Sequence, residues 1–258
     1  MKTLLTSVLV TVLMLAVVPT ADAQANQAAE KKKQQRVAKI EKQLERKLCA
    51  WSTEQARQVA AKLPADSTEA LIAEGRVLSQ EKKHGEAIKA LEQAVKAAKG
   101  DPEPLVHLGE ARLAAGKRGP ANQAFRQALA HADKQLAKQP DNAWNHYYRG
   151  VALQRLRKFD AAIAALEHSR ELDGKNPLTV YQLGATHAFM EQWKPAVDLL
   201  DRAIEMDSGI AYAYYYRGMS AGKLKRMDLL INDLDRFVAL APEAPEADSA
   251  RRILASVR

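Results

Sequence analysis

The side chains that could do acid–base, nucleophilic or metal chemistry are not grouped in the patterns that such chemistry requires. The six histidines are scattered, and none has another histidine four residues away, the spacing that places two metal ligands on one helix face. There is no His-Glu-x-x-His, no Cys-x-x-Cys, no phosphate-binding glycine loop, and no Gly-x-Ser-x-Gly elbow between a strand and a helix. We therefore expect no enzyme activity, no catalytic residue, no metal site and no cofactor.

The residues that do recur at fixed spacing are glycines and their apolar partners. Five glycines are separated by 34, 41, 34 and 34 residues: Gly75, Gly109, Gly150, Gly184 and Gly218. Sixteen residues after each comes a large apolar residue: Leu91, Phe125, Leu166, Leu200 and Leu234. Such offsets predict helical hairpins in which a glycine lets two helices approach closely and a large side chain fills the space beside it. One hairpin cannot bury its apolar face alone, so we expect a stack of them.

The recurring residues resemble the tetratricopeptide repeat family, whose signature includes Leu-Gly followed by Ala-x3-Phe and a closing Pro. Leu108-Gly109 and Leu183-Gly184 carry the first pair, and Ala121 with Phe125 carries the second. Arg149-Gly150 and Arg217-Gly218 match the common Arg-Gly variant, and Pro140 and Pro242 close repeats. The resemblance implies an all-α, right-handed superhelix of five hairpins. It covers about Ser67 to Pro242.

The repeat pattern also predicts the boundaries of the chain's parts. The five repeats are expected at 67–100, 101–140, 141–175, 176–209 and 210–242, followed by a C-terminal capping helix over 243–258. Asp66-x-x-Glu69 is a capping box that predicts the start of the first repeat. The 41-residue spacing predicts a second helix lengthened by two turns in repeat two. Leu230 and Phe237 stand in repeat five where the other repeats have small residues, which indicates a transition to the cap.

The first 23 residues are typical of a secretory signal peptide. Met1 and Lys2 precede an uncharged apolar run from Leu4 to Val18, and small residues follow at the positions that a signal peptidase reads. The run is shorter than the roughly 20 residues that span a bilayer. We therefore expect an exported, periplasmic protein that is soluble after cleavage.

Residues 24–64 form an expected basic helical extension, in which 26–50 hold much of the formal net charge of +8. An apolar stripe of Val37, Ile40, Leu44 and Leu48 leaves three interpretations open: packing on repeat one, self-association as a coiled coil, or docking on an anionic lipid or polymer. A nucleic-acid partner is not expected, because no aromatic residues are interleaved. Cys49 is either a small buried hydrophobe or the site of an intermolecular disulfide.

The family resemblance implies that the first helix of each repeat lines a concave groove. All 7 tyrosines lie between Tyr147 and Tyr216, on the first helices of the last three repeats. We expect Tyr148 and Tyr214 to pack between helices. The residues predicted to bind a partner in the groove are Trp144, Tyr147, Arg155, Tyr181, Phe189, Tyr212, Tyr215 and Lys223.

Two functions fit these residues. The first is a protein–protein interaction scaffold of the cell envelope that binds a peptide or protein of unknown identity. The alternative is a module that binds cell-wall glycan, a polymer whose sugar rings would stack on the groove aromatics.

Overall fold

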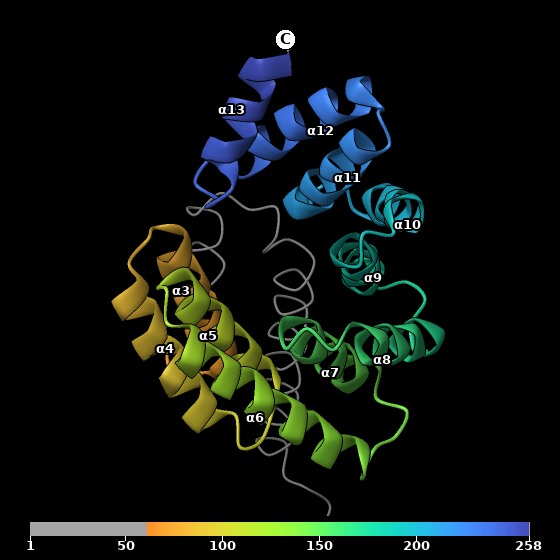
Figure 1. Ribbon diagram of the computed structural model, residues 1–258. Coiled ribbons are helices and arrows are strands. Elements are labelled where there is room, and N and C mark those ends of the chain that lie inside the picture. Colours follow the sequence, from red (N-terminus) through yellow and green to blue (C-terminus); the bar gives the residue numbers. More distant parts are fainter. Residues whose placement is uncertain (1–60, 258) are drawn as a thin grey trace, which may run out of the picture. The chain divides into compact units, whose positions relative to one another are not determined.

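The computed structural model describes residues 61–257, and within them the chain is entirely helical (Figure 1). Eleven helices and no strands occur in this part of the chain, so the predicted all-α class is confirmed. The expected signal peptide, Cys49 and nearly all of the basic extension lie outside the described residues. No helix in the described part is long and apolar enough to cross a membrane.

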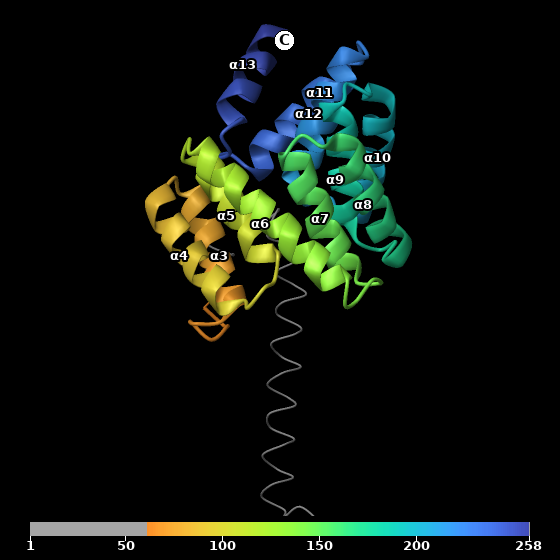
Figure 2. The same cartoon turned by 60° about the horizontal axis from the view of Figure 1, so that its bottom comes forward.

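The helices form five hairpins and one final helix (Figures 1 and 2). Each hairpin consists of a first helix, a turn of three residues and a second helix. Each second helix packs on the first helix of the next hairpin, and neighbouring first helices also touch, so every hairpin contacts the next one, as in a repeat solenoid. The bounds are α3 Thr68–Gln80, α4 His84–Ala97, α5 Glu103–Ala114, α6 Arg118–Leu136, α7 Ala143–Arg155, α8 Phe159–Leu172, α9 Pro177–Phe189, α10 Trp193–Met206, α11 Ala211–Lys223, α12 Met227–Leu240 and α13 Ala247–Val257.

The extra residues of repeat two lengthen its second helix, as predicted. Helix α6 has 19 residues, whereas α4, α8, α10 and α12 have 14 each. The capping prediction at Asp66 is wrong by one residue. Ser67 is the N-cap of α3, and its hydroxyl accepts a hydrogen bond of 3.1 Å from the Ala70 backbone N–H. A serine hydroxyl reaches that donor as well as a carboxylate does, so sequence alone did not separate the two neighbours.

The turn inside each hairpin has one repeated geometry. Its middle residue is left-handed in every hairpin, with φ of 60° at Lys82, 62° at Arg157, 60° at Glu191 and 61° at Lys225; Gly116 has 74°. The next residue's N–H then bonds back to the carbonyl five residues earlier, as Arg226 does to Ala221 at 2.9 Å. Glycine adopts this conformation freely, whereas another residue is strained there by about 1–2 kcal/mol.

Inside the hairpins, glycine and large apolar residues meet as the spacing predicts. A Cβ added to Gly150 would lie 2.5 Å from Leu166 Cγ, and one on Gly184 would lie 2.6 Å from Leu200 Cγ. Gly75 with Leu91 and Gly109 with Phe125 make the same kind of contact even more closely. Each of these four large side chains is at most 1% exposed, so it has no room to move aside.

Repeat five uses a different arrangement. A Cβ added to Gly218 would lie 2.9 Å from Asp233 Cβ, and one added to Gly222 would lie 3.2 Å from Leu230 Cδ2. Phe237 is fully buried, with its ring 4.9 Å from that of Tyr215 and 5.4 Å from that of Tyr212. Both large residues belong to a core shared with α13, which contributes Ala247, Ala250 and Leu254.

Candidate functional site on the first helices

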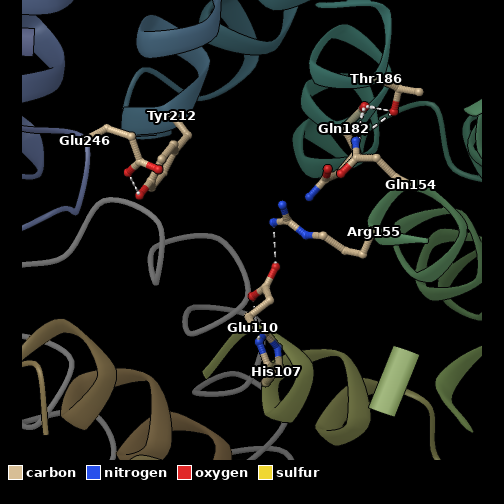
Figure 3. A network of polar contacts seen from close by, with 8 residues as sticks. All are labelled: His107, Glu110, Gln154, Arg155, Gln182, Thr186, Tyr212 and Glu246. Carbon is tan, nitrogen blue, oxygen red and sulfur yellow. Dashed lines mark hydrogen bonds and ion pairs between the residues drawn. The ribbon is translucent and has the colours of Figure 1, made fainter. Parts of the chain in front are cut away.

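Polar side chains from neighbouring first helices meet on one face of the solenoid (Figure 3). Arg155 at the end of α7 donates from Nη2 to Glu110 Oε1 on α5 at 2.8 Å. Burial acts to raise the pKa of the Glu110 carboxyl, but the Arg155 guanidinium and His107 outweigh it and hold that pKa below its usual range. The predicted anion-binding arginine therefore already has a carboxylate partner within the solenoid.

His107 lies between two glutamates on the same helix. Its Nε2 is 3.6 Å from Glu103 Oε1, and its Nδ1 is 3.7 Å from Glu110 Oε2. Burial acts to lower the pKa of His107 and nearby Arg76 does the same, yet the two carboxylates raise it above the ordinary value of 6.5. A chain of alternating charges thus runs from Glu103 through His107 and Glu110 to Arg155.

Part of Arg155 remains accessible to a ligand, because 27% of its side chain is exposed. Among the described residues its buried Nε has no hydrogen-bond partner, although its Nη2 is engaged by Glu110. Tyr216 and Tyr181 lie close enough to this guanidinium to act on its pKa when they ionise. Conversely, burial raises the pKa of Tyr216 to about 12 even though Arg155 acts to lower it. Tyr216 is therefore a neutral phenol at physiological pH, able to donate as well as accept a hydrogen bond.

Five aromatic rings from α9 and α11 form a connected group, which we call the aromatic cluster. Tyr216 is its centre: its ring centroid lies 5.3 Å from that of Phe189, 5.3 Å from Tyr215, 6.3 Å from Tyr212 and 6.4 Å from Tyr181. Phe189 is 39% exposed, and the four tyrosines are partly exposed. The cluster thus offers apolar area and several phenol groups at the surface.

The two ends of this face are tied to other elements. The Tyr212 hydroxyl donates to Glu246 at 2.7 Å, which joins α11 to the segment before α13. Burial and the neighbouring Glu246 both raise the pKa of Tyr212. On the other side, Gln154 Nε2 donates to Thr186 Oγ1 at 2.7 Å and to the Gln182 carbonyl at 3.2 Å, which holds α7 against α9. These buried bonds fix the helices that present the cluster.

Trp144 and Tyr147, also predicted to bind, lie in a second aromatic group at the start of α7. The Trp144 ring is 5.4 Å from that of Tyr147 and 5.9 Å from that of Tyr148, and both tyrosines are only 8% exposed. Trp144 and Tyr148 line a cavity of about 420 Å³ together with Asp101 and Glu103. Tyr148 and Tyr214, also 8% exposed, pack between helices as expected.

The structure therefore divides the eight predicted residues into three places. Tyr181, Phe189, Tyr212 and Tyr215 lie in the aromatic cluster, with Arg155 beside it. Trp144 and Tyr147 lie at the other end of α7. Lys223 is the last residue of α11, with its Nζ 5.9 Å from the Trp193 ring. Sequence reasoning missed Tyr216, the centre of the cluster, whose one available signal was its place in a run of three tyrosines. It also missed the pairing of Glu110 with Arg155, because the two residues are 45 positions apart.

One motif with a hydrolase-like sequence proves to be structural. Gly218 to Gly222 reads Gly-x-Ser-x-Gly, but it lies in the middle of α11 and not at a turn after a strand. Ser220 is fully buried, and its hydroxyl has no hydrogen-bond partner among the described residues. No group of three or more His, Cys, Asp or Glu side chains in this part of the chain is arranged to hold a metal ion.

Comparison with known proteins agrees with this architecture. A family model described as tetratricopeptide repeat matches residues 68–101, which include the first hairpin. The fold is similar to that of TTC0263, a thermophilic TPR protein of Thermus thermophilus, with a TM-score of 0.56, 17% identity, and 74% of this chain and 98% of that chain covered. The first hairpin therefore matches a tetratricopeptide repeat by sequence, and the described chain has the fold of a tetratricopeptide repeat protein.

Two further solved structures are more distant. YrrB, described as a TPR protein with an unusual peptide-binding site, has a TM-score of 0.40 and 18% identity, and 78% of this chain and 100% of that chain are covered. A MamA chain of Desulfovibrio magneticus RS-1 has a TM-score of 0.42 and 17% identity, with 75% and 97% covered. No curated protein matches the chain.

Proposed function

We propose that this chain is a non-enzymatic scaffold of the cell envelope that binds an extended peptide segment of a partner protein at the aromatic cluster. The observation that supports the proposal is the position of the cluster beside Arg155. Five partly exposed rings supply apolar area at low entropic cost, and the Arg155 side chain beside them is 27% exposed. An apolar peptide side chain would lie on the rings while a carboxylate or carbonyl meets Arg155.

The ring geometry favours a peptide over the glycan alternative. Tyr215 and Tyr216 are inclined at 76°, Tyr212 and Tyr215 at 76°, and Phe189 and Tyr216 at 70°. Rings in edge-to-face contact cover one another's faces and leave edges and hydroxyls at the surface. A sugar ring stacks on an open, flat aromatic face, whereas a peptide uses the notches and hydroxyls between tilted rings.

Site-specific crosslinking tests the proposal. A benzoylphenylalanine at position 189 should crosslink a partner in intact cells, and Tyr181→Ala with Arg155→Gln should abolish that crosslink while leaving the helicity unchanged. The matched control is benzoylphenylalanine at position 172, where Leu172 is 38% exposed at the end of a second helix. Equal crosslinking from both positions, or a partner that survives both substitutions, would contradict the groove site. Co-sedimentation with purified wall polymer that depends on the same residues would favour the glycan alternative.

The envelope location is proposed from the apolar run at Leu4–Val18 and the small residues that follow it. Cell fractionation with intact-mass measurement tests it directly. We expect a periplasmic chain that lacks about the first 23 residues. A cytoplasmic chain of full mass would overturn the location and leave the binding site itself untouched.

A further inference from the structure

The turns inside the five hairpins carry a strong excess of positive charge. We consider each turn together with the last residue of the helix before it and the first residue of the helix after it. These segments contain two acidic residues, Glu81 and Glu191, against ten basic ones: Lys82, Lys83, Lys117, Arg118, Arg155, Arg157, Lys158, Lys223, Lys225 and Arg226. All of the ten except Arg155 are exposed. We call these nine exposed residues the basic edge.

The loops between hairpins have the opposite charge. Bounded in the same way, they contain three basic residues, Lys99, Lys138 and Lys175, and seven acidic ones: Asp101, Glu103, Asp141, Asp173, Asp207, Glu243 and Glu246. Because successive helices alternate in direction, the turns inside hairpins and the loops between them lie at opposite ends of the helices. Side-chain contacts join the third, fourth and fifth turns: the Phe159 ring is 6.1 Å from that of Phe189, and Lys223 lies over Trp193.

Exposed apolar side chains gather at the same edge. Six large apolar residues of the described chain are prominently exposed, and four of them lie in or beside these turns: Leu113, Phe189, Leu224 and Met227, at 36–41%. Trp193 is partly exposed there as well. Basic and apolar side chains side by side are typical of surfaces that meet the headgroup region of a bilayer.

The charges of the basic edge are little neutralised by the fold. Lys83 pairs with Glu81 at 3.1 Å, but Lys117, Arg118, Lys158, Lys225 and Arg226 make no ion pair with any described residue. Three turns also place Lys or Arg at the left-handed position, which Gly116 fills without strain in the second turn. Lys82 and Lys225 are exposed at this position, and Arg157 lies over the Phe159 ring at 5.6 Å. Exposed charges held at a strained position indicate a use for them in the solvent.

We propose that the basic edge docks on the anionic surface of a lipid bilayer. Lys and Arg would contact lipid phosphates, while Trp193, Leu224 and Met227 would enter the interface. Basic charges spread over four of the five turns fit an extended surface better than a compact protein patch, and the fourth turn supplies Trp193 but no basic residue. The acidic opposite edge sets the orientation by repulsion. The aromatic cluster on the first helices would remain accessible to a partner, so this inference stands independently of the proposed function.

Vesicle co-sedimentation of the full chain tests the docking. The variant Lys158→Gln/Lys225→Gln/Arg226→Gln is compared with Lys99→Gln/Lys138→Gln/Lys175→Gln, which removes three exposed charges from the other edge. On vesicles of phosphatidylcholine with phosphatidylglycerol, the first variant should bind about a hundredfold more weakly than wild type, at about fivefold for each charge. The control should lose no more than about threefold. Pure phosphatidylcholine vesicles measure the contribution of the apolar run near the N-terminus, which all three chains share.

Tryptophan quenching locates the contact. The sequence has three tryptophans, and Trp193 lies on the proposed docking edge whereas Trp144 begins a first helix at the other edge. With the remaining tryptophans replaced by Phe, Trp193 should be quenched by brominated anionic vesicles and Trp144 should not. Equal losses in the two triple variants, or equal quenching of both tryptophans, would overturn the proposal. A sedimentation coefficient that differs between wild type and the first variant in the absence of vesicles would also overturn the proposal. It would indicate that the basic edge associates with the acidic edge of a second copy.

Discussion

The pairing of Arg155 with Glu110 determines which charges a ligand meets on the face formed by the first helices. Each alone would be a strong recognition group for a charged ligand. The fold brings them within 2.8 Å, so a ligand meets a neutralised pair with His107 behind it and competes for the contacts that remain. Their side chains are 27% and 37% exposed, so water screens the pair and we assign it no large contribution to stability.

His107 should make stability depend on pH. Its pKa in the folded state is raised above 6.5 by Glu103 and Glu110. The stabilisation by protonated His107 is therefore fully present below 6.5 and is lost as the pH rises through the folded-state pKa. We expect the free energy of unfolding of wild type to exceed that of His107→Gln by a margin that shrinks with increasing pH, measured by urea denaturation. A margin that is constant with pH would show that this histidine does not titrate as described.

The pair of Arg217 and Asp233 is a stronger test of buried charge. Arg217 donates to both carboxylate oxygens of Asp233 at 2.9 and 2.7 Å, and the Asp233 side chain is only 3% exposed. Asp233→Asn leaves the largely buried Arg217 guanidinium with only the exposed Asp201 as a partner charge, and we expect a loss of about 3 kcal/mol in the free energy of unfolding. Asp201 also contacts Arg217 but is 57% exposed, so Asp201→Asn should cost less than about 0.5 kcal/mol. Thermal and urea denaturation of both variants measure these losses. Similar losses in the free energy of unfolding for Asp233→Asn and Asp201→Asn would contradict the expected difference.

At the scale of the helix, each of the first four hairpins depends on a glycine, because the lack of a side chain lets its two helices pack closely. In four repeats a glycine allows a large apolar residue of the second helix to sit directly against the first helix. Repeat five has two glycine contacts in place of this one: Gly218 lies against Asp233, and Gly222 lies against Leu230. The last hairpin keeps the same topology with a different interior, because its large residues Leu230 and Phe237 also pack on α13.

Gly109→Ala should disrupt the second hairpin. The added methyl group would overlap the ring of Phe125, which is fully buried and cannot move aside. We expect the free energy of unfolding to fall by about 2 kcal/mol. Gly119 is the matched control, because no atom lies within 4 Å of a Cβ built on it in α6. Gly119→Ala should be neutral or stabilise by about 0.5 kcal/mol. Circular dichroism during urea unfolding measures both variants. Equal free energies of unfolding for Gly109→Ala and Gly119→Ala would contradict the close contact at Gly109.

At the scale of the whole described chain, stability is distributed among neighbours. Each hairpin contacts only adjacent elements, so damage at one end should stay local. The end that carries α13 is the sensitive one, because Phe237 and Leu234 rely on that helix for part of their burial.

Deletion of residues 247–258 tests this view. It would uncover the fully buried Phe237 and leave Glu246, the acceptor for Tyr212, in a chain end. Hydrogen exchange should accelerate in α11 and α12, which corresponds to a loss of about 3 kcal/mol in local opening free energy, and remain unchanged in α3 to α6. Uniform acceleration across all hairpins would instead mean that the solenoid unfolds as a single unit.

The fold was largely predictable from sequence, because the contacts that define a hairpin are local. Gly150 and Leu166 are sixteen positions apart in one helix pair, so their spacing predicts their meeting, and the extra residues after His131 could only lengthen α6. The sequence predicted that aromatic residues of the first helices form the candidate site, but it did not predict which of them come together. Tyr181 and Tyr215 could be placed on first helices by counting, whereas the burial of Tyr147 and the central position of Tyr216 depend on neighbouring repeats.

The sequence by itself determined the repeat, its register and the helical class, since these follow from periodic apolar residues and from glycines at close helix crossings. Only the tertiary structure decided which charges neutralise one another and which remain in solvent. The sequence placed much of the net charge of +8 in residues 26–50 and gave no sign of a basic edge along the hairpins. Stacking the hairpins places Lys225, Arg157 and their counterparts at one edge and the acidic loops at the other, because every helix reverses the direction of the chain. That separation of charge is a property of topology and is not visible in any single repeat.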